Sequence, residues 1–393
     1  MIKGVQQIFQ EGYAEYERSH AVSKSMRDTA WSVMNCRTAV LGGYQEVCEA
    51  GHFEKNHYNS CRNRQCPQCN TAQNEKWLEF QRSRLLDCAH YHVIFTLPHS
   101  LNGLWKHNER EMTNLLFQNA SATLRELLED ETYLGAEAGW IASLHTWSRD
   151  LSLHPHLHVL ITAGGLNEER WVEKTGNILL PFRVVRDLFR GKMRASLSEQ
   201  LESGTLKVPP SATLQGCLNE LNRLGRQPWN VKLCPRYEHG QGVLLYLSKY
   251  LRGGPVSDRR ILSLEHGRVR LKTGRGSEAR SVEYGVSTFI QRFLRHVPPK
   301  NSIRVRSYGL YSNSARQTSW ETANRSLGQN GAARTSSPMK VQRQVSLKLA
   351  EKLWSPANCP VCGKTLHVRV LPEIRNPARR KETVPRAERK DAA

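Results

Sequence analysis

Three histidines alternate along the segment His154-Pro155-His156-Leu157-His158, which continues into an apolar, β-branched run. Because successive side chains of a strand point to opposite faces, His154, His156 and His158 would share one face, while Leu157 would face a core. Imidazoles are common metal ligands, so three of them on one strand face predict a metal site. The alternative is a histidine face that is only solvated or hydrogen-bonded.

A second group of metal-ligand side chains crowds residues 36–69. Cys66 and Cys69 form a C-x-x-C pair, a spacing that presents two thiolates to one tetrahedral zinc ion. Two more ligands must come from upstream, and a cluster of free thiols is the alternative. The predicted zinc ligands are Cys48, Cys61, Cys66 and Cys69, with His52 as an alternative ligand.

Two tyrosines lie in the segment 242–252, which the Gly-Gly-Pro stop after it marks as a helix. Tyr246 and Tyr250 are four residues apart and so share a helical face, where such pairs commonly serve only packing. Beside a phosphodiester polarised by a divalent cation on His156 and His158, either tyrosine could act as a nucleophile. The resulting phosphotyrosine would conserve the bond energy, so strands could be rejoined without ATP.

The charge of the chain predicts a polyanionic partner. Its 393 residues include 57 Lys and Arg against 36 Asp and Glu, a formal net charge of +21. Such an excess is typical of proteins that bind nucleic acid. We expect DNA contacts from basic residues near the cysteines, on a basic helix over 181–200 and beside the tyrosines: Arg62, Arg64, Arg186, Arg190, Lys249 and Arg252.

The sequence has no membrane-spanning run and no apolar signal segment at its N-terminus. We therefore expect a cytoplasmic protein without a membrane partner. The ten cysteines then serve as metal ligands or ordinary thiols, not disulfides.

The periodicity predicts the elements that must position these residues. Helices are expected over 1–35, 72–88, 101–130, 181–200, 213–224 and 286–295, and strands over 91–97, 140–147, 154–162, 230–233, 260–264 and 268–271. Polar residues 312–339 predict a mobile linker, and Cys359 and Cys362 form a second C-x-x-C with only half a zinc site visible. Three domains are expected: a helical and zinc-binding module at 1–88, a domain with the histidine strand and the paired-tyrosine helix at 89–310, and a linker with a basic tail at 311–393.

Several segments together resemble a known family. His156-Leu157-His158 is similar to the HUH motif (histidine, hydrophobic residue, histidine), and the Tyr246/Tyr250 helix is similar to that of two-tyrosine HUH transposases. The resemblance to rolling-circle insertion-sequence transposases extends to SCRNRQCPQC, YHVIFTLPHSLN, LHTWSRDLSLHPHLHVLITAGG and STFIQRFLRHVPPKNSIRVRSYGL, and so to about residues 36–310.

This resemblance implies an α+β fold in which helices flank a palm-like antiparallel sheet. It also implies cleavage of single-stranded DNA at element ends and at the target through 5′-phosphotyrosine intermediates. Mg²⁺ or Mn²⁺ would bind at the HUH histidines and Zn²⁺ at the N-terminal cysteines. The protein would be bacterial and would associate with the nucleoid while bound to DNA. Enzymes of this type add a third metal ligand, for which His145 and Gln241 are candidates, while His154 could instead orient a ligand.

One feature departs from the family, and three further protein classes stay open. Gly51 stands where the family's first C-x-x-C has its second cysteine, so either His52 or Cys61 substitutes for it or the site is weakened. The histidine segment also resembles the signature of histidine-triad nucleotide hydrolases, although these small enzymes leave the cysteines and tyrosines unexplained. A plasmid replication initiator or relaxase would use the same chemistry in a different setting. A zinc-finger DNA-binding protein would have no activity.

Overall fold

A six-stranded antiparallel sheet carries the histidine segment. The computed structural model describes residues 4–82, 84–174, 179–238, 254–274, 280–312, 317–328 and 358–372. In this sheet the strand order is β11-β4-β5-β3-β7, with β6 paired to β5. The strands are β3 (His90–Thr96), β4 (Glu137–Trp147), β5 (Leu153–Asn167), β6 (Arg170–Glu173), β7 (Val231–Leu233) and β11 (Val305–Gly309). The predicted α+β class with an antiparallel sheet is confirmed.

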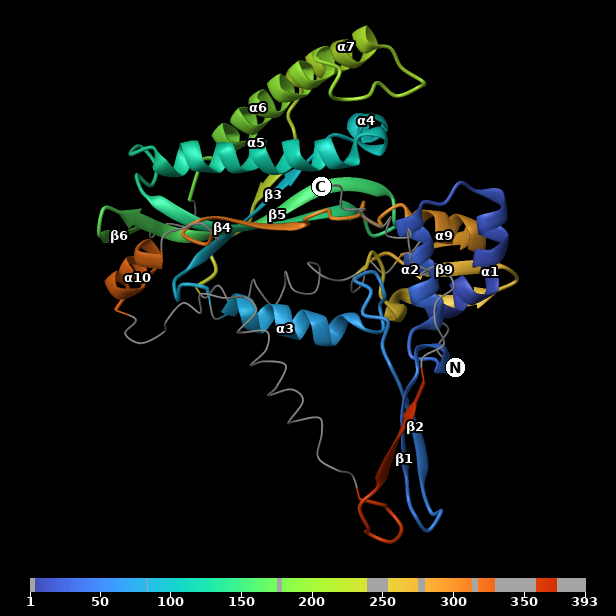
Figure 1. The fold of residues 1–393 in the computed structure, drawn as a ribbon. Coiled ribbons are helices and arrows are strands. Elements are labelled where there is room, and N and C mark those ends of the chain that lie inside the picture. Colours follow the sequence, from blue (N-terminus) through green and yellow to red (C-terminus); the bar gives the residue numbers. More distant parts are fainter. Residues whose placement is uncertain are drawn as a thin grey trace, which may run out of the picture.

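The two faces of this sheet meet different helices (Figure 1). On one face, Phe95 and Leu157 are fully buried against α5 (Glu109–Glu129) and α6 (Phe182–Glu202), and the rings of Phe95 and Phe189 lie 4.8 Å apart. On the other face, α3 (Asn70–Arg82) packs Trp77 and Leu78 against Leu160. Since β5 alternates, His156 and His158 share the α3 face with Leu160.

A second core joins the N-terminus to a segment far along the chain. The predicted helix over 1–35 is two helices, α1 (Val5–Ser19) and α2 (Lys24–Asn35), because Ser23 caps the second by accepting from the Met26 amide. They pack on α9 (Val286–Leu294), where the rings of Phe9 and Phe293 lie 5.1 Å apart. The same core includes the sheet of β8 (Ile261–Glu265), β9 (Arg268–Lys272) and β10 (Ser281–Gly285).

Part of the stretch expected to be a linker is a helix. Helix α10 (Gln317–Ser326) forms inside the stretch expected to be a linker, so that prediction is wrong here. A single large side chain explains the difference, because Trp320 is 2% exposed and its indole donates to the carbonyl oxygen of Arg84. Because the residues around Trp320 are polar, the sequence did not indicate that this side chain is buried.

Strand β12 (His367–Leu371) returns to the N-terminal region. It pairs with β1 (Gly43–Val47), which pairs with β2 (Glu54–Tyr58), and the three strands form an arm that projects from the body (Figure 1). The other short elements connect the sheets and helices: α4 (Asn102–His107), α7 (Leu214–Gly225), η1 (Ala39–Leu41), η2 (His99–Leu101) and η3 (Asp258–Arg260).

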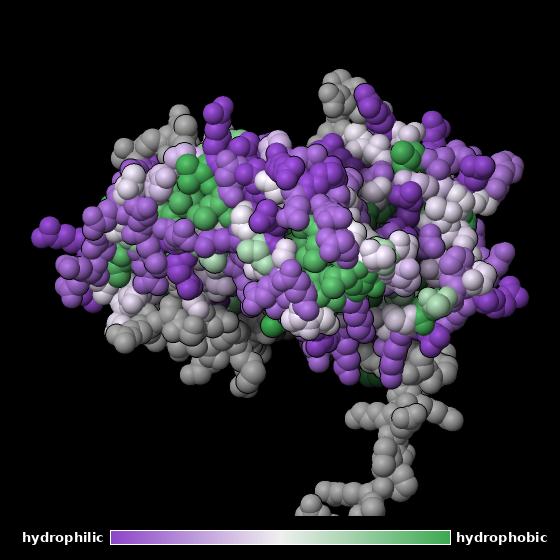
Figure 2. Space-filling view, turned by 90° about the horizontal axis from the view of Figure 1, so that it is seen from above, coloured by the Kyte–Doolittle hydropathy of each residue, from purple (hydrophilic) through white to green (hydrophobic). Residues whose placement is uncertain are grey.

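The outer side of α5 and α6 is mainly hydrophilic, with a few separate hydrophobic areas (Figure 2). Among the helices that the structure describes, none combines the length and apolarity needed to cross a membrane. The domain boundaries at 88/89 and 310/311 stay predictions.

Candidate active site and metal centres

Three imidazoles meet on the α3 face of the central sheet. His156 and His158 lie on β5, and His145 lies opposite His156 on the adjacent strand β4. One ring nitrogen from each of the three lies within 4.8 Å of the others. His145 and His158 are 2% and 7% exposed, so the strand ladder and the surrounding core fix both side chains. The structure thus brings together the two HUH histidines and one of the two candidates for a third ligand.

The β4–β5 ladder becomes irregular just beyond the pair of His145 and His156. His145 pairs with His156, but Trp147 pairs with Leu153, so β5 contains one extra residue between these pairs. Pro155, which has no amide hydrogen to donate, lies in this irregular part, where its carbonyl still accepts from the Leu97 amide. Bulges of this kind re-aim side chains beside functional sites.

Neighbouring groups orient the histidine rings. Nδ1 of His156 lies 2.6 Å from the His154 carbonyl oxygen, which can only accept, so Nδ1 carries the hydrogen and Nε2 keeps its lone pair. Nδ1 of His158 lies 2.9 Å from Nε2 of His92 on β3. His154 is outside the three-imidazole group and contacts His99, with 2.9 Å between ring nitrogens. A partner on the second nitrogen is typical of metal-binding histidines.

Burial keeps these imidazoles neutral. The pKa of His156 is lowered to about 4, by burial first and against the hydrogen bond to the His154 carbonyl oxygen, and that of His158 is lowered to about 2, by burial first and then by the neighbouring rings of His156 and His92. Burial likewise lowers the pKa of His92 to about 4, with a smaller contribution from Lys232. Neutral rings present lone pairs, so this donor set suits a divalent cation at neutral pH.

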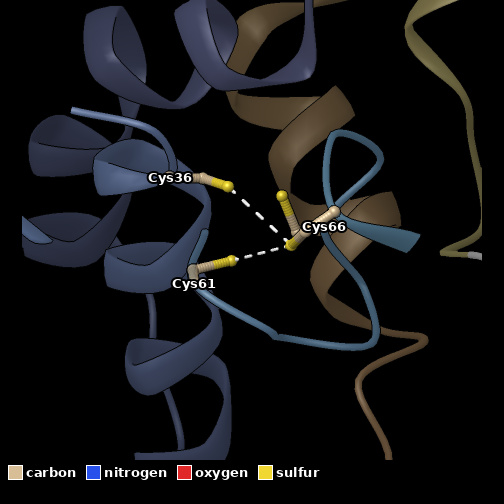
Figure 3. A group of neighbouring side chains, drawn as sticks. Cys36, Cys61 and Cys66 are labelled. Atoms are coloured by element: carbon tan, nitrogen blue, oxygen red, sulfur yellow. Dashed lines mark hydrogen bonds between the residues drawn. The ribbon is translucent and has the colours of Figure 1, made fainter. Parts of the chain in front are cut away.

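Four thiols meet beside the second core: Cys36, Cys61, Cys66 and Cys69. The sulfur of Cys69 lies 3.3 Å from that of Cys61 and 3.8 Å from that of Cys36. Figure 3 shows the thiols of Cys36, Cys61 and Cys66 turned toward one another. Hydrogen bonds with the other thiols, that of Cys61 first, lower the pKa of Cys36, whereas the hydrogen bonds with Cys36 raise the pKa of Cys61 and of Cys66, so the four thiols share their protons unequally. Four thiolates are a structural zinc set.

This grouping corrects the predicted zinc ligand set. Cys36, at the end of α2, takes the place expected for Cys48. Cys48 and the alternative ligand His52 lie instead in the arm, next to Cys359 and Cys362. Sequence proximity favoured Cys48, but strand β1 carries it away along the hairpin. One signal in the sequence indicates that Cys48 does not belong to the four-thiol cluster: Gly51 stands where the family's C-x-x-C has its second cysteine.

Some of the remaining predicted site residues lie outside the described residues, and others lie away from the histidines. The tyrosines, the basic residues beside them and the other third-ligand candidate lie outside the described residues: Tyr246, Tyr250, Lys249, Arg252 and Gln241. Arg186 and Arg190 lie on α6, which covers the opposite sheet face from the histidines, and both pair with Asp187. Arg62 and Arg64 belong to the loop of the thiol cluster. Their DNA contacts stay predictions.

The fold and the site define a class of α+β proteins that carry three facing imidazoles on an antiparallel sheet, together with a four-thiol module of the kind that binds structural zinc. The comparisons with known proteins identify this class more closely. A family model described as "Putative transposase" matches residues 139–318, and one described as "Transposase zinc-binding domain" matches residues 8–97. No solved structure matches the chain.

Two curated relatives cover most of the chain. The "Putative transposase y4qJ" of Sinorhizobium fredii is 30% identical over 95% of this chain and 97% of its own length. The "Transposase for insertion sequence element IS801" of Pseudomonas savastanoi pv. phaseolicola is 29% identical over 73% of this chain and 70% of its own length. The chain belongs to this family of insertion-sequence transposases of the HUH type, with an N-terminal zinc-binding module.

Proposed function

We propose that this transposase cleaves and rejoins single-stranded DNA at the ends of its element and at the target, with Tyr246 and Tyr250 as nucleophiles and a histidine-bound Mg²⁺ or Mn²⁺ as cofactor. The observation that carries the proposal is the group of three neutral imidazoles from two paired strands. His145, His156 and His158 would hold the cation. When bound, it would polarise the scissile phosphate and stabilise the charge that develops there.

The chemical step needs a tyrosine oxygen in line with the phosphorus. The phenol oxygen of Tyr246 or Tyr250 forms a bond to phosphorus, and the bond between phosphorus and the 3′ oxygen breaks. The phenol proton is lost, and the departing 3′ oxygen takes up a proton to become a hydroxyl. The product is a 5′-phosphotyrosine, from which the reverse attack by a 3′ hydroxyl rejoins a strand without ATP.

The described residues on either side of the tyrosine segment contact elements that border the histidine site. On one side, Tyr237 pairs with His90 at the start of β3, the strand that also carries His92. On the other side, a Cβ added to Gly254 would lie 2.3 Å from the Gln65 carbonyl oxygen, so this glycine contacts the thiol-cluster loop. The side-chain amide of Gln65 in turn donates to the carbonyl oxygen of His296, whose ring contacts the hydroxyl of Thr146 beside His145.

Charge supports DNA as the substrate. A net charge of +21 attracts phosphates at long range, and the loop residues Arg62 and Arg64 lie between the zinc-binding cysteines. Binding should therefore weaken steeply as salt rises, because phosphate contacts release counterions.

The test is a covalent adduct assay with end-labelled single-stranded DNA from the element ends, in Mg²⁺ or Mn²⁺. The wild type should give a labelled protein band that survives denaturation, and the double variant Tyr246→Phe/Tyr250→Phe should bind DNA without forming it. Tyr237→Phe, in a tyrosine outside the proposed helix, is the matched control and should keep the adduct. Unchanged cleavage by the double variant would remove these tyrosines from the mechanism.

A further inference from the structure

A third group of metal-ligand side chains lies at the tip of the arm, apart from the three histidines and from the thiol cluster of the zinc-binding module. It combines two residues near the N-terminus with two near the C-terminus, and their ligand atoms all lie within 4.8 Å of one another: Cys48, His52, Cys359 and Cys362. The sulfur of Cys48 lies 3.6 Å from that of Cys362 and 3.9 Å from Nδ1 of His52. Two thiolates on one tetrahedral zinc ion are about 3.8 Å apart, given Zn–S bonds near 2.3 Å.

The two loops that supply these ligands are built alike. The amide of Cys48 donates to the carbonyl oxygen of Phe53, and that of Cys359 donates to the carbonyl oxygen of Lys364, so each cysteine opens a loop closed five residues later. Within each loop a glycine donates back to the carbonyl oxygen of that cysteine. Both glycines, Gly51 and Gly363, have positive φ values of 73° and 70°. Each loop thus turns tightly and presents two ligands to one point.

The surrounding sheet cannot hold this arrangement by packing. The buried side chains at the tip are Cys48, Cys359 and Leu366, with Phe53 and Cys362 partly buried beside them. Four of the five residues of β12 are exposed. The ion pair between His367 and Glu49 is also exposed and therefore contributes little. A three-stranded sheet without an apolar face needs another source of stability, and a structural metal supplies it in small domains.

We propose a second structural zinc site that fastens β12 to the β1–β2 hairpin, with the ligands Cys48, His52, Cys359 and Cys362. Three thiolates and one imidazole are a structural zinc set, with all four positions filled by protein and none left for a substrate. The ion links the two ends of the chain, since Cys48 and Cys362 are 314 residues apart. The C-x-x-C at Cys359, half a site by sequence, is completed by the hairpin.

Zinc content of the purified full-length protein, measured by mass spectrometry of the metal, tests this site without any activity assay. The wild type should hold two zinc ions per chain, and Cys359→Ser/Cys362→Ser should hold one. The matched control is Cys217→Ser/Cys234→Ser, which removes two thiols outside both clusters and should keep two ions. One ion in the wild type, or two in the Cys359→Ser/Cys362→Ser variant, would overturn the proposal.

A milder substitution guards against misfolding of the double variant. The His52 side chain is exposed, so His52→Ala should remove one ligand and leave the fold intact. A chelator should then withdraw one of the two ions from this variant at a concentration that leaves both in the wild type. In cobalt-loaded protein, His52→Cys should keep both ions and change one site's spectrum from three sulfurs and a nitrogen toward four sulfurs. Unchanged chelator resistance of His52→Ala, or an unchanged spectrum of His52→Cys, would contradict the ligand assignment.

Discussion

The histidine site and the Cys36 thiol cluster position their ligands by opposite means. His145 and His156 face each other across a hydrogen-bonded ladder, so the sheet holds them whether or not an ion is bound. Cys36 comes from the end of a helix, while Cys61, Cys66 and Cys69 come from the loop before α3. A loop of this kind is held by what binds it. Removing a ligand should therefore affect chemistry at the first site and folding at the second.

The largest effect is expected at the thiol cluster. Cys66→Ser/Cys69→Ser should release the zinc of this cluster and unfold the module around it, since structural zinc contributes binding free energy on the order of 10 kcal/mol. Zinc content and thermal unfolding followed by circular dichroism measure both effects. Cys217→Ser/Cys234→Ser is the control. An unchanged melting temperature after loss of the zinc would show that the loop stays folded without the ion.

At the histidine site the same kind of change should leave the fold alone. His158→Ala should lower single-strand cleavage by about 1000-fold, the scale lost when a stabiliser of transition-state charge is removed. DNA affinity and melting temperature should stay close to the wild type. His107→Ala, an exposed histidine on α4, should cleave normally. An equal loss of DNA binding in His158→Ala would make the histidines structural and erase the contrast between the two sites.

A smaller effect is expected one contact away from the proposed cation. His92 lies 2.9 Å from Nδ1 of His158 and acts by orienting that ring. His92→Ala should therefore raise the Mn²⁺ concentration needed for half-maximal cleavage by about 10- to 100-fold, with the maximal rate less affected. Titration of cleavage against Mn²⁺ separates the two quantities. If half-saturation did not move, His92 would be a packing residue only.

The smallest effect is expected at His296, which lies between the thiol-cluster loop and the strand that carries His145. The ring of His296 reaches Leu151 and Thr146, its carbonyl oxygen accepts from Gln65, and burial lowers its pKa to about 3. Between that value and about 6.5, the unfolded chain binds a proton that the folded ring does not. Acidification through this window should therefore lower the unfolding free energy, by about 1.4 kcal/mol per pH unit for this histidine.

Denaturant unfolding at several pH values measures that slope. His296→Gln should flatten it by one proton's contribution. Equal slopes in His296→Gln and the wild type would mean that the folded protein accommodates a proton on His296.

The sequence predicts the two regions unequally, for a physical reason. The histidine face follows from a period of two, a local rule, and so His156 and His158 share a face in the structure as expected. His92 was missed because it reaches His158 from a neighbouring strand, and strand pairing is a long-range property. The same limit explains the cysteines: Cys66 and Cys69 belong together by spacing, but only the fold brings Cys36 to them.

Where the structure differs from the predicted elements and ligand sets, the cause is again a contact between residues far apart in the sequence. Trp320 anchors α10 through the carbonyl oxygen of Arg84, more than 200 residues earlier, so the local composition gave no sign of it. Cys48 and Cys359 each looked like part of an incomplete site. The presence of two incomplete ligand sets in one chain was the sequence signal that could have predicted that they form one site.

Peptide mapping of the covalent adduct tests the central claim most directly. The wild-type protein would be incubated with single-stranded element ends and Mn²⁺, digested with protease and nuclease, and analysed by mass spectrometry. A nucleotide linked through its 5′ phosphate to Tyr246 or Tyr250, absent when His158 is alanine, is the predicted result. Cut DNA with no nucleotide on either tyrosine would contradict the account.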